Sequence, residues 1–331
     1  MKKIIFTIML ISSLQVFSAD RVVLLEDFTN CSCGPCWTVE PTVDAFVNNH
    51  LGSGLAVIRV HVSWPSPNDP IYIANRPEQN ARVGFYGVSG VPHFQVDGAL
   101  SSSAYGLENA YNTRSAVPTN LQIYVARNGN DESGTVSIRL IAEAEIVTSE
   151  TLRLFSTIVE DEVPGAGYWA PTVFDQAFRD NLFGVAGPVV QFSAPYPDTL
   201  FYEADYDITA WVSDNLYLAT FVQEYATASK EVINANWAKF MDLQTGIGSG
   251  AISETPVLLI HSNPASGSIE ASVEIPQNTS GVISVYDTTG RLVDSRIASD
   301  CNSIDIDEPG LYIVRLDISG EAVTESVIVL R

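Results

Sequence analysis

Basic residues are scarce in this sequence, and charge of either sign is limited. The 331 residues include 17 Lys and Arg against 39 Asp and Glu, which gives a formal net charge of −22. Such a chain repels phosphate backbones, which argues against nucleic-acid binding. Charged residues make up 17% of the chain, below the ~25% of an average protein. An acidic, lysine-poor surface suits an extracellular protein.

Several catalytic and ligand-binding motifs are also missing. The chain has no G-x-S-x-G elbow, no phosphate-binding glycine loop and no zinc-binding helix motif, so hydrolase and nucleotide-binding functions lack support. The four cysteines include one CxxC pair, whereas a four-cysteine zinc site needs two. His50, His61 and His261 have no ligand partners nearby in the sequence. We therefore predict no metal site and no cofactor.

The first residues have the layout of a secretory signal peptide. A basic start over residues 1–3 precedes an apolar run over residues 4–17, and the small residues Ser18 and Ala19 follow. The apolar region of a signal peptide spans ~7–15 residues, whereas a membrane-spanning helix needs ~20. Residues 1–19 are therefore predicted to be removed on export, and the remaining chain to fold in an oxidising compartment.

The rest of the chain divides into three segments, which predict a multidomain α/β plus all-β protein. Residues 20–115 combine strand-like apolar runs with helical periodicity, which indicates an α/β domain. Residues 116–250 show period-2 runs between turn residues, which indicates an antiparallel β-sandwich. Within it, Asp175–Asn181 is predicted to form a short helix. Residues 255–331 are again all-β and are expected to form a small immunoglobulin-like β-sandwich.

The chemistry of the chain centres on Cys33-Gly34-Pro35-Cys36, which lies between a predicted buried strand over residues 21–28 and a predicted helix. Backbone N–H groups and the dipole at a helix N-terminus stabilise a thiolate, so the pKa of Cys33 should lie below the ~8.5 of free cysteine. Cys33 would attack a partner's disulfide, and the shielded Cys36 would then attack Cys33 to release the partner. A purely structural disulfide is the alternative interpretation of this pair.

Two further features of the first segment resemble the thioredoxin family. Asp27 lies six residues before Cys33, the offset at which thioredoxins carry a buried aspartate that exchanges a proton with the second cysteine. A carboxylate on a buried strand has a raised pKa, which suits a general base. The sequence from Tyr86 to Pro92 is similar to the family's cis-proline loop. The resemblance implies a thioredoxin-like fold, a cis Val91–Pro92 bond facing the cysteines, and a substrate-binding strand edge at Val91.

The sequence departs from the thioredoxin pattern around this site. Ser32 replaces the tryptophan that usually precedes the first cysteine. His93 follows the proline and either lowers the pKa of the nucleophile or simply packs. Cys31 is a strand-end thiol, a cysteine bonded elsewhere or a competing resolving thiol. The connection over residues 63–80 is longer than usual and is expected to be irregular, to overhang the CxxC pair and to select partners.

The predicted site combines these features. The candidate catalytic residues are Cys33, Cys36 and Asp27. The candidate substrate-binding residues are Gly34, Pro35, Trp37, Trp64, Val91, Pro92 and His93.

The last segment resembles the C-terminal sorting domain of the type IX secretion system, which moves proteins across the outer membrane. The resemblance is carried by Asn263-Pro264, by the sequence VYDTTGR over residues 285–291 and by GLYIVR over residues 310–315. The alternation of apolar residues alone would also allow a plain β-sandwich module. Cys301 lies inside this segment and is expected to be a free or transiently paired thiol.

The whole arrangement also resembles a family of outer-membrane-associated thioredoxin-like proteins. The resemblance implies export, followed by secretion or cell-surface and outer-membrane association, with the type IX secretion machinery as a partner. The leading hypothesis is a secreted or surface thiol–disulfide oxidoreductase that acts on protein thiols. The alternative is a surface binding protein with a static Cys33–Cys36 disulfide.

Overall fold

The computed structural model contains two compact units, residues 1–249 and 250–331. The structure describes residues 19–148, 150–165, 173–226 and 229–243 of the first unit, and 257–260, 265–274, 281–298, 301–318 and 321–330 of the second. The predicted signal peptide, apart from Ala19, and the Asn263-Pro264 motif lie outside the described residues.

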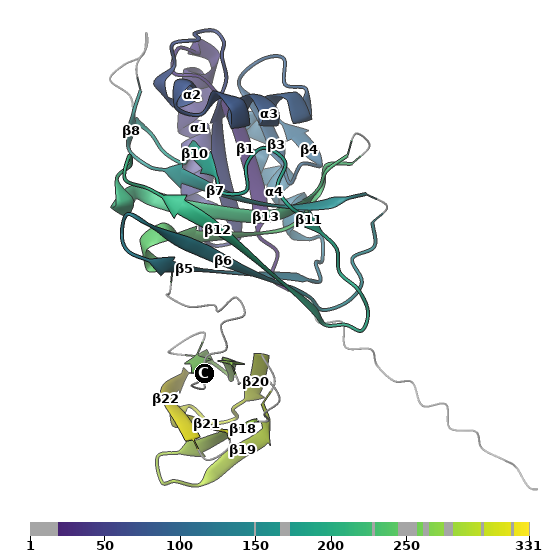
Figure 1. The fold of residues 1–331 in the computed structure, drawn as a ribbon, viewed down its shortest axis with the longest axis vertical. Helices are drawn as coiled ribbons and strands as arrows, with labels where there is room; N and C mark the ends of the chain where they lie inside the picture. Colours follow the sequence, from purple (N-terminus) through teal and green to yellow (C-terminus); the bar gives the residue numbers. More distant parts are fainter. Residues whose placement is uncertain are drawn as a thin grey trace, which may run out of the picture. The chain divides into compact units, whose positions relative to one another are not determined.

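One large sheet organises the first unit (Figure 1). Its strands follow the order β14-β13-β7-β10-β2-β1-β3-β4, and β11 also pairs with β7. The bounds of these strands are β1 Val23–Thr29, β2 Leu55–His61, β3 His93–Val96, β4 Leu100–Ser102, β7 Leu152–Glu160, β10 Ala177–Asn181, β11 Val189–Val190, β13 Leu216–Glu224 and β14 Val232–Lys239. β1 runs parallel to β2 and antiparallel to β3.

The strands β1 and β2 lie deep inside the first unit. All seven residues of each strand are buried, as expected of nearly continuous apolar runs. Four ionisable residues interrupt these runs: Glu26, Asp27, Arg59 and His61. Buried charges need partners, and these four side chains take part in the polar clusters described below.

Four α-helices occur in the described part of the chain, and Figure 1 shows α1, α2 and α3 gathered at one end of the first unit. α1 packs Val43, Phe46 and Val47 against Val23 and Leu25 of β1. None of the helices in the described residues has the length and apolar character needed to span a membrane. The helix bounds are α1 Gly34–His50, α2 Pro70–Ala74, α3 Arg76–Tyr86 and α4 Leu107–Ser115, with 3-10 turns at η1 Ala104–Gly106, η2 Ser213–Asn215 and η3 Phe240–Asp242.

The connection over residues 63–80 is largely helical, which corrects the prediction of an irregular loop. α2 begins after Asp69, whose Oδ1 accepts hydrogen bonds from two N–H groups of the first turn, at 2.9 and 3.1 Å. α3 begins after Asn75, whose side chain accepts another. Pro70 and Pro77 occupy the first turns of these helices, where the missing N–H has no helical partner to lose.

A second sheet of the first unit has the order β12-β6-β5, with bounds β5 Leu121–Gly129, β6 Ser133–Ala142 and β12 Asp198–Asp207. Its residues Leu121, Val136 and Leu140 share a core with Leu154 of β7 and Leu218 of β13. A short hairpin joins β8 Val163–Pro164 to β9 Val173–Phe174. The two sheets therefore form a sandwich in which one layer is part of the large sheet.

The large sheet runs through both of the segments that the sequence suggested. β10 pairs with β2 on one side and with β7 on the other, so one continuous layer contains strands from both residues 20–115 and residues 116–250. The predicted boundary near residue 115 lies within one compact unit. The prediction of a short helix over Asp175–Asn181 is wrong. Ala177–Asn181 instead forms β10, the strand that joins the two segments.

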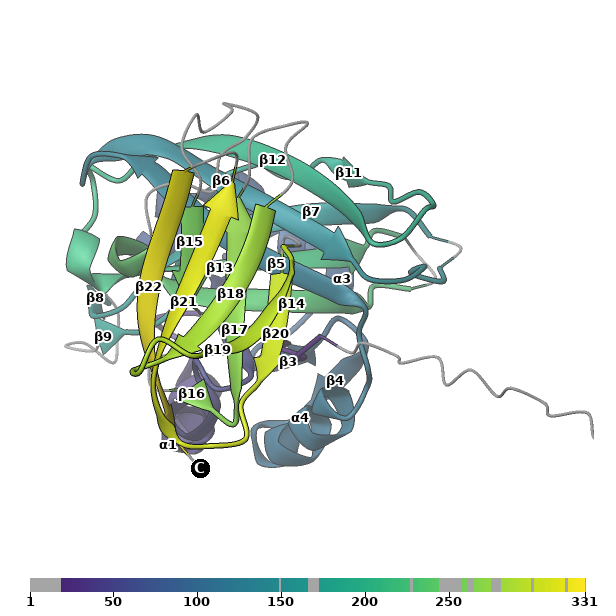
Figure 2. The same cartoon turned by 90° about the horizontal axis from the view of Figure 1, so that it is seen from below.

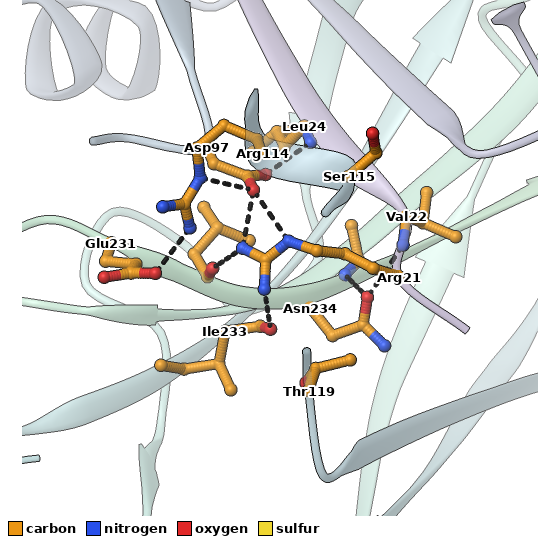
Figure 3. A network of polar contacts seen from close by, with 12 residues as sticks. Arg21, Val22, Leu24, Asp97, Arg114, Ser115, Thr119, Glu231, Ile233 and Asn234 are labelled. Atoms are coloured by element: carbon orange, nitrogen blue, oxygen red, sulfur yellow. Dashed lines mark hydrogen bonds and ion pairs between the residues drawn. The ribbon is translucent and has the colours of Figure 1, made fainter. Parts of the chain in front are cut away.

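A buried ion-pair network ties the start of the described chain to distant segments (Figure 3). Asp97, fully buried, accepts hydrogen bonds from Arg21 Nη2 at 2.6 Å and from Arg114 Nε at 3.1 Å. Its other carboxylate oxygen accepts the Leu24 N–H at 2.8 Å. Arg21 also donates to two carbonyls of β14, and Arg114 pairs with Glu231 just before that strand. The network therefore links β1, the β3–β4 turn, α4 and β14.

The second unit is a sandwich of a three-stranded sheet, β15-β17-β20, and a five-stranded sheet, β16-β22-β21-β18-β19. Figure 2 shows β22, β21 and β18 side by side. Tyr312, Val314 and Leu316 of β21 are buried, whereas Leu311 and Ile313 are exposed, which is the predicted period-2 pattern. The strand bounds are β15 Val257–Ile260, β16 Ala265–Ser266, β17 Ser268–Glu274, β18 Gly281–Asp287, β19 Leu292–Ile297, β20 Cys301–Asp305, β21 Gly310–Ile318 and β22 Glu321–Leu330.

Candidate active site

The candidate active site begins in the turn where β1 ends. The backbone oxygen of Asn30 accepts the Cys33 N–H at 2.9 Å, and its side-chain oxygen accepts the Ser32 N–H at 2.9 Å. α1 begins at Gly34, so Cys33 is its N-cap residue. The Sγ of Cys33 accepts a hydrogen bond from the Cys36 N–H at 3.1 Å. A backbone donor at the start of α1 therefore points at this sulfur.

Cys33 and Cys36 form a disulfide with 2.06 Å between the sulfurs. Both residues are buried, each with 3% of its surface exposed. Gly34 is half-buried, whereas Pro35 and Trp37 are exposed. The two cysteines are therefore buried, whereas Pro35 and Trp37, their neighbours in the first turn of α1, are exposed.

The loop before β3 lies against the first sulfur. The Val91–Pro92 peptide bond is cis, as the thioredoxin resemblance implied. The backbone oxygen of Val91 lies 3.8 Å from Cys33 Sγ. His93 packs its ring edge-on against Phe28, with 5.6 Å between centroids. Of the predicted substrate-binding residues, Val91 thus places its backbone oxygen beside the Cys33 sulfur, and Trp37 donates its N–H to the Cys33 backbone oxygen at 3.1 Å.

Asp27 lies on the face of β1 that α1 covers. Val23 and Leu25 pack against the buried side of α1, and side chains two apart on a strand point the same way. Asp27 therefore also faces α1, whose first turn carries Cys36. One of its carboxylate oxygens is buried and has no hydrogen-bond partner among the described residues.

Arg59 joins Asp27 to the same helix. The two residues are in register on neighbouring strands, so their side chains lie side by side. The Arg59 guanidinium pairs with Glu40 and, at 2.6 Å, with Asp44 of α1. Residues four apart share one face of a helix, which places Cys36, Glu40 and Asp44 along the side that meets Arg59. One buried guanidinium therefore lies among three carboxylates, those of Asp27 on β1 and of Glu40 and Asp44 on α1.

Burial dominates the electrostatics of this cluster. Desolvation raises the pKa of Asp27 to about 6, although the positive charge of Arg59 and the nearby His61 act in the opposite direction. Desolvation, with repulsion from Asp175 and Asp27, also raises the pKa of Asp44 to about 6. Burial therefore raises the pKa of both carboxyl groups above the ordinary range of aspartate.

The connection that follows β2 is tied to the turn before Cys33. The Asn30 Nδ2 donates to the backbone oxygens of Val62, at 2.7 Å, and Ser66, at 3.0 Å. Trp64 is half-buried, packs against the core cluster that contains Phe28, and has a cis peptide bond to the following proline. The start of the connection that was predicted to overhang the site is thus anchored beside it.

A second polar cluster was missed in the sequence. Cys31, His61 and Asp69 are all buried, and their ligand-type atoms lie within 4.8 Å of one another. The residues are far apart in the sequence, so their spacing gave no sign of a cluster, and His61 had no partner assigned to it.

Arg59, Glu40 and Asp44 were also missed. The sequence did contain one signal for this cluster, which is the arginine in the otherwise apolar run of β2. A buried arginine needs carboxylate partners. Which carboxylates it finds depends on how α1 packs, and that is not visible in local sequence.

The C-terminal unit matches a known family. Residues 260–330 match the model of the secretion system C-terminal sorting domain. This unit is a type IX sorting domain. The sorting domain indicates export followed by secretion or by cell-surface and outer-membrane association, and it implies contact with the type IX secretion machinery. Cys301 lies in its strand β20, but the expected state of that thiol falls outside the described side chains.

One solved structure has a similar fold over nearly the whole chain. It is HBP35 of Porphyromonas gingivalis, with a TM-score of 0.59 and 16% sequence identity over 95% of this chain and 99% of that chain. At this identity the likeness shows the fold alone. No curated protein sequence matches this chain.

Two other solved structures are more distant. Domains 3 and 4 of rat CD4 have 13% identity and a TM-score of 0.19 over 61% of this chain and 96% of that chain. Red sea bream transglutaminase has 9% identity and a TM-score of 0.21 over 74% of this chain and 38% of that chain. Neither similarity is close enough to support an argument about this protein.

Proposed function

We propose that this exported protein is a thiol–disulfide oxidoreductase that acts on protein thiols through Cys33 and Cys36. In this proposal residues 20–115 are a thioredoxin-like domain, residues 116–250 a β-sandwich and residues 255–331 the sorting domain. The observation that carries the proposal is the position of Cys33 Sγ, between the Cys36 N–H at 3.1 Å and the Val91 oxygen at 3.8 Å, beside a cis proline.

The reduced pair would act on a client disulfide in two steps. The Cys33 thiolate attacks one client sulfur, so a mixed disulfide forms and the client's other sulfur leaves as a thiolate. Cys36 then loses its proton, attacks Cys33 Sγ and releases the second client thiol. The client gains two electrons, the pair becomes the disulfide, and the reverse sequence oxidises a client dithiol.

Asp27 is proposed as the group that takes the proton from Cys36. Its carboxylate faces α1, and its pKa of about 6 leaves it mainly ionised at neutral pH yet close enough to accept a proton. Arg59 would hold this carboxylate beside the helix. Val91 and Pro92 would provide the edge along which a client peptide lies, flanked by Pro35, Trp37, Trp64 and His93.

One observation favours the alternative of a surface binding protein with a static disulfide. Cys33 is only 3% exposed in the disulfide form, and a redox cysteine must be reached by its partner. The two functions differ in whether Cys33 can form a mixed disulfide.

The test is a trapping experiment on the mature chain, reduced and then incubated with insulin as a disulfide-bonded client. Cys36→Ser keeps the nucleophile and removes the resolving thiol, so we expect a covalent adduct that a reductant releases. Cys33→Ser/Cys36→Ser is the matched control and should give none, because it lacks the nucleophile. Cys31 and Cys301 are present in both variants, so any adduct that they form would appear equally in both. Equal labelling of the two variants, or no adduct with Cys36→Ser, would favour the static disulfide.

A further inference from the structure

We propose that Cys31, His61 and Asp69 form a binding site for one zinc ion, distinct from the Cys33–Cys36 disulfide. The three residues come from the turn after β1, the end of β2 and the N-cap of α2. The site therefore joins three segments beside the candidate active site without using its two disulfide-bonded cysteines.

The ligand atoms of the three side chains lie within 4.8 Å of one another, and two of the distances are close to those of a zinc site. The His61 Nδ1 lies 3.9 Å from Cys31 Sγ and 2.7 Å from Asp69 Oδ2. Zinc lies ~2.3 Å from thiolate sulfur and ~2.0–2.2 Å from imidazole nitrogen or carboxylate oxygen. In a tetrahedral arrangement the sulfur and nitrogen are then about 3.6 Å apart, and the nitrogen and oxygen about 3.3 Å. The present distances differ from these by about 0.3 and 0.6 Å.

The surroundings hold the ligands in place. Asp69 Oδ2 also accepts the Cys31 N–H at 2.7 Å, while its Oδ1 caps α2, so its carboxylate has little freedom to turn away. Ile71 of α2 and Phe174 of β9 pack in one apolar cluster with Cys31. Supporting contacts of this kind orient metal ligands and strengthen binding.

The chemistry of the donors fits zinc in particular. A thiolate, an imidazole and a carboxylate form a mixed soft and hard set, which suits zinc better than magnesium or calcium. The bound site would carry no net charge, because the two negative ligands balance Zn²⁺, and a neutral site suits a buried position. Among the described residues no fourth His, Cys, Asp or Glu joins the group, so a water molecule or another donor would complete the coordination.

Zinc binding to this site exchanges a proton for the metal. If His61 is neutral, the Cys31 thiol loses one proton and the imidazole proton moves from Nδ1 to Nε2. The Asp69 carboxylate binds without a proton change. Because one proton is released for each zinc bound, the affinity for zinc should fall by about tenfold for each pH unit over the range in which the thiol of the metal-free protein is protonated.

The test uses the mature chain with Cys301→Ser and with the Cys33–Cys36 disulfide kept oxidised, so that Cys31 is the one thiol left. Cobalt(II) is the probe, because a thiolate ligand gives it a charge-transfer absorption. We expect one cobalt per chain with this absorption, and displacement of the cobalt by zinc. Cys31→Ser should abolish the absorption, and Asp69→Asn, which keeps an oxygen to cap α2, should weaken zinc binding by at least about tenfold.

Tryptophan fluorescence of each variant checks that it is folded. X-ray absorption of the zinc-loaded parent chain gives the ligands without any variant in the cluster, and one sulfur at ~2.3 Å is expected. The proposal is overturned if no metal binds, if the cobalt absorption survives Cys31→Ser in the folded chain, or if zinc has only nitrogen and oxygen ligands. None of these results depends on oxidoreductase activity.

Discussion

Replacing Asp27 by asparagine should stabilise the first unit at alkaline pH. In the native state burial raises the pKa of Asp27 from its ordinary 3.8 to about 6. The folded protein therefore binds this proton more tightly than the unfolded chain does, and its stability falls as the pH rises from about 4 to above 6. Each pKa unit corresponds to about 1.36 kcal/mol, so the ionised carboxylate costs about 3 kcal/mol at pH 8.

Asp27→Asn removes this cost and leaves Arg59 paired with Glu40 and Asp44. The variant should be more stable than the parent by about 2–3 kcal/mol at pH 8, and the difference should shrink toward zero near pH 4. The assay is urea unfolding at both pH values with the disulfide oxidised, followed by tryptophan fluorescence. All five tryptophans precede residue 250, so the signal reports the first unit alone.

Glu26→Gln is the matched control on the opposite face of β1. Glu26 pairs with the buried Arg82 at 2.6 Å, so its loss leaves a buried guanidinium without its carboxylate. This variant should lose about 3–5 kcal/mol, the opposite sign to Asp27→Asn. A decrease in stability for Asp27→Asn at pH 8, or a change that is the same at both pH values, would refute the assignment of Asp27 as a desolvated carboxylate.

Three further substitutions test the buried charges and the hairpin turn. Arg59→Met leaves its carboxylates without a cation and should cost about 3–5 kcal/mol at pH 8 but less at pH 5; equal losses in urea unfolding at the two pH values would contradict the clustering. Asp97→Asn keeps an acceptor for the backbone but removes the charge between two arginines, so it should cost about 3 kcal/mol, and an unchanged thermal midpoint would contradict this. Gly98→Ala should cost more than Gly87→Ala, because both have positive φ but only the first places its Cβ against the Lys230 carbonyl. Similar losses in urea unfolding would show that this close approach does not matter.

Local sequence was sufficient to predict the secondary structure at the centre of the first unit. The apolar runs of β1 and β2 and the helical spacing of α1 are strong signals, because each element buries a long, regular face. The segment Asp175–Asn181 was misassigned as helix, since seven residues are too few for periodicity to separate a strand from a short helix. Its true role depends on pairing with β2 and β7, which are far away in the sequence.

Part of the candidate site could also be predicted from local sequence. Cys33, Cys36 and Pro92 belong to short motifs whose geometry is local or is implied by family resemblance. The partners of Arg59 come from α1, and those of His61 come from the turn after β1 and the N-cap of α2, so their identities depend on tertiary structure. A buried ionisable residue in an apolar run indicates that a polar or charged partner exists, but local sequence does not identify that partner.

The central claim is that the start of α1 holds Cys33 ionised near neutral pH. It is tested most directly by measuring the alkylation rate of Cys33 against pH in reduced, mature Cys36→Ser protein, with the modified peptide identified by mass spectrometry. The account predicts that the rate titrates with an apparent pKa below ~7.5, about one unit under that of free cysteine. A Cys33 that titrates at ~8.5 or above, or that is not alkylated in the folded protein, would contradict it.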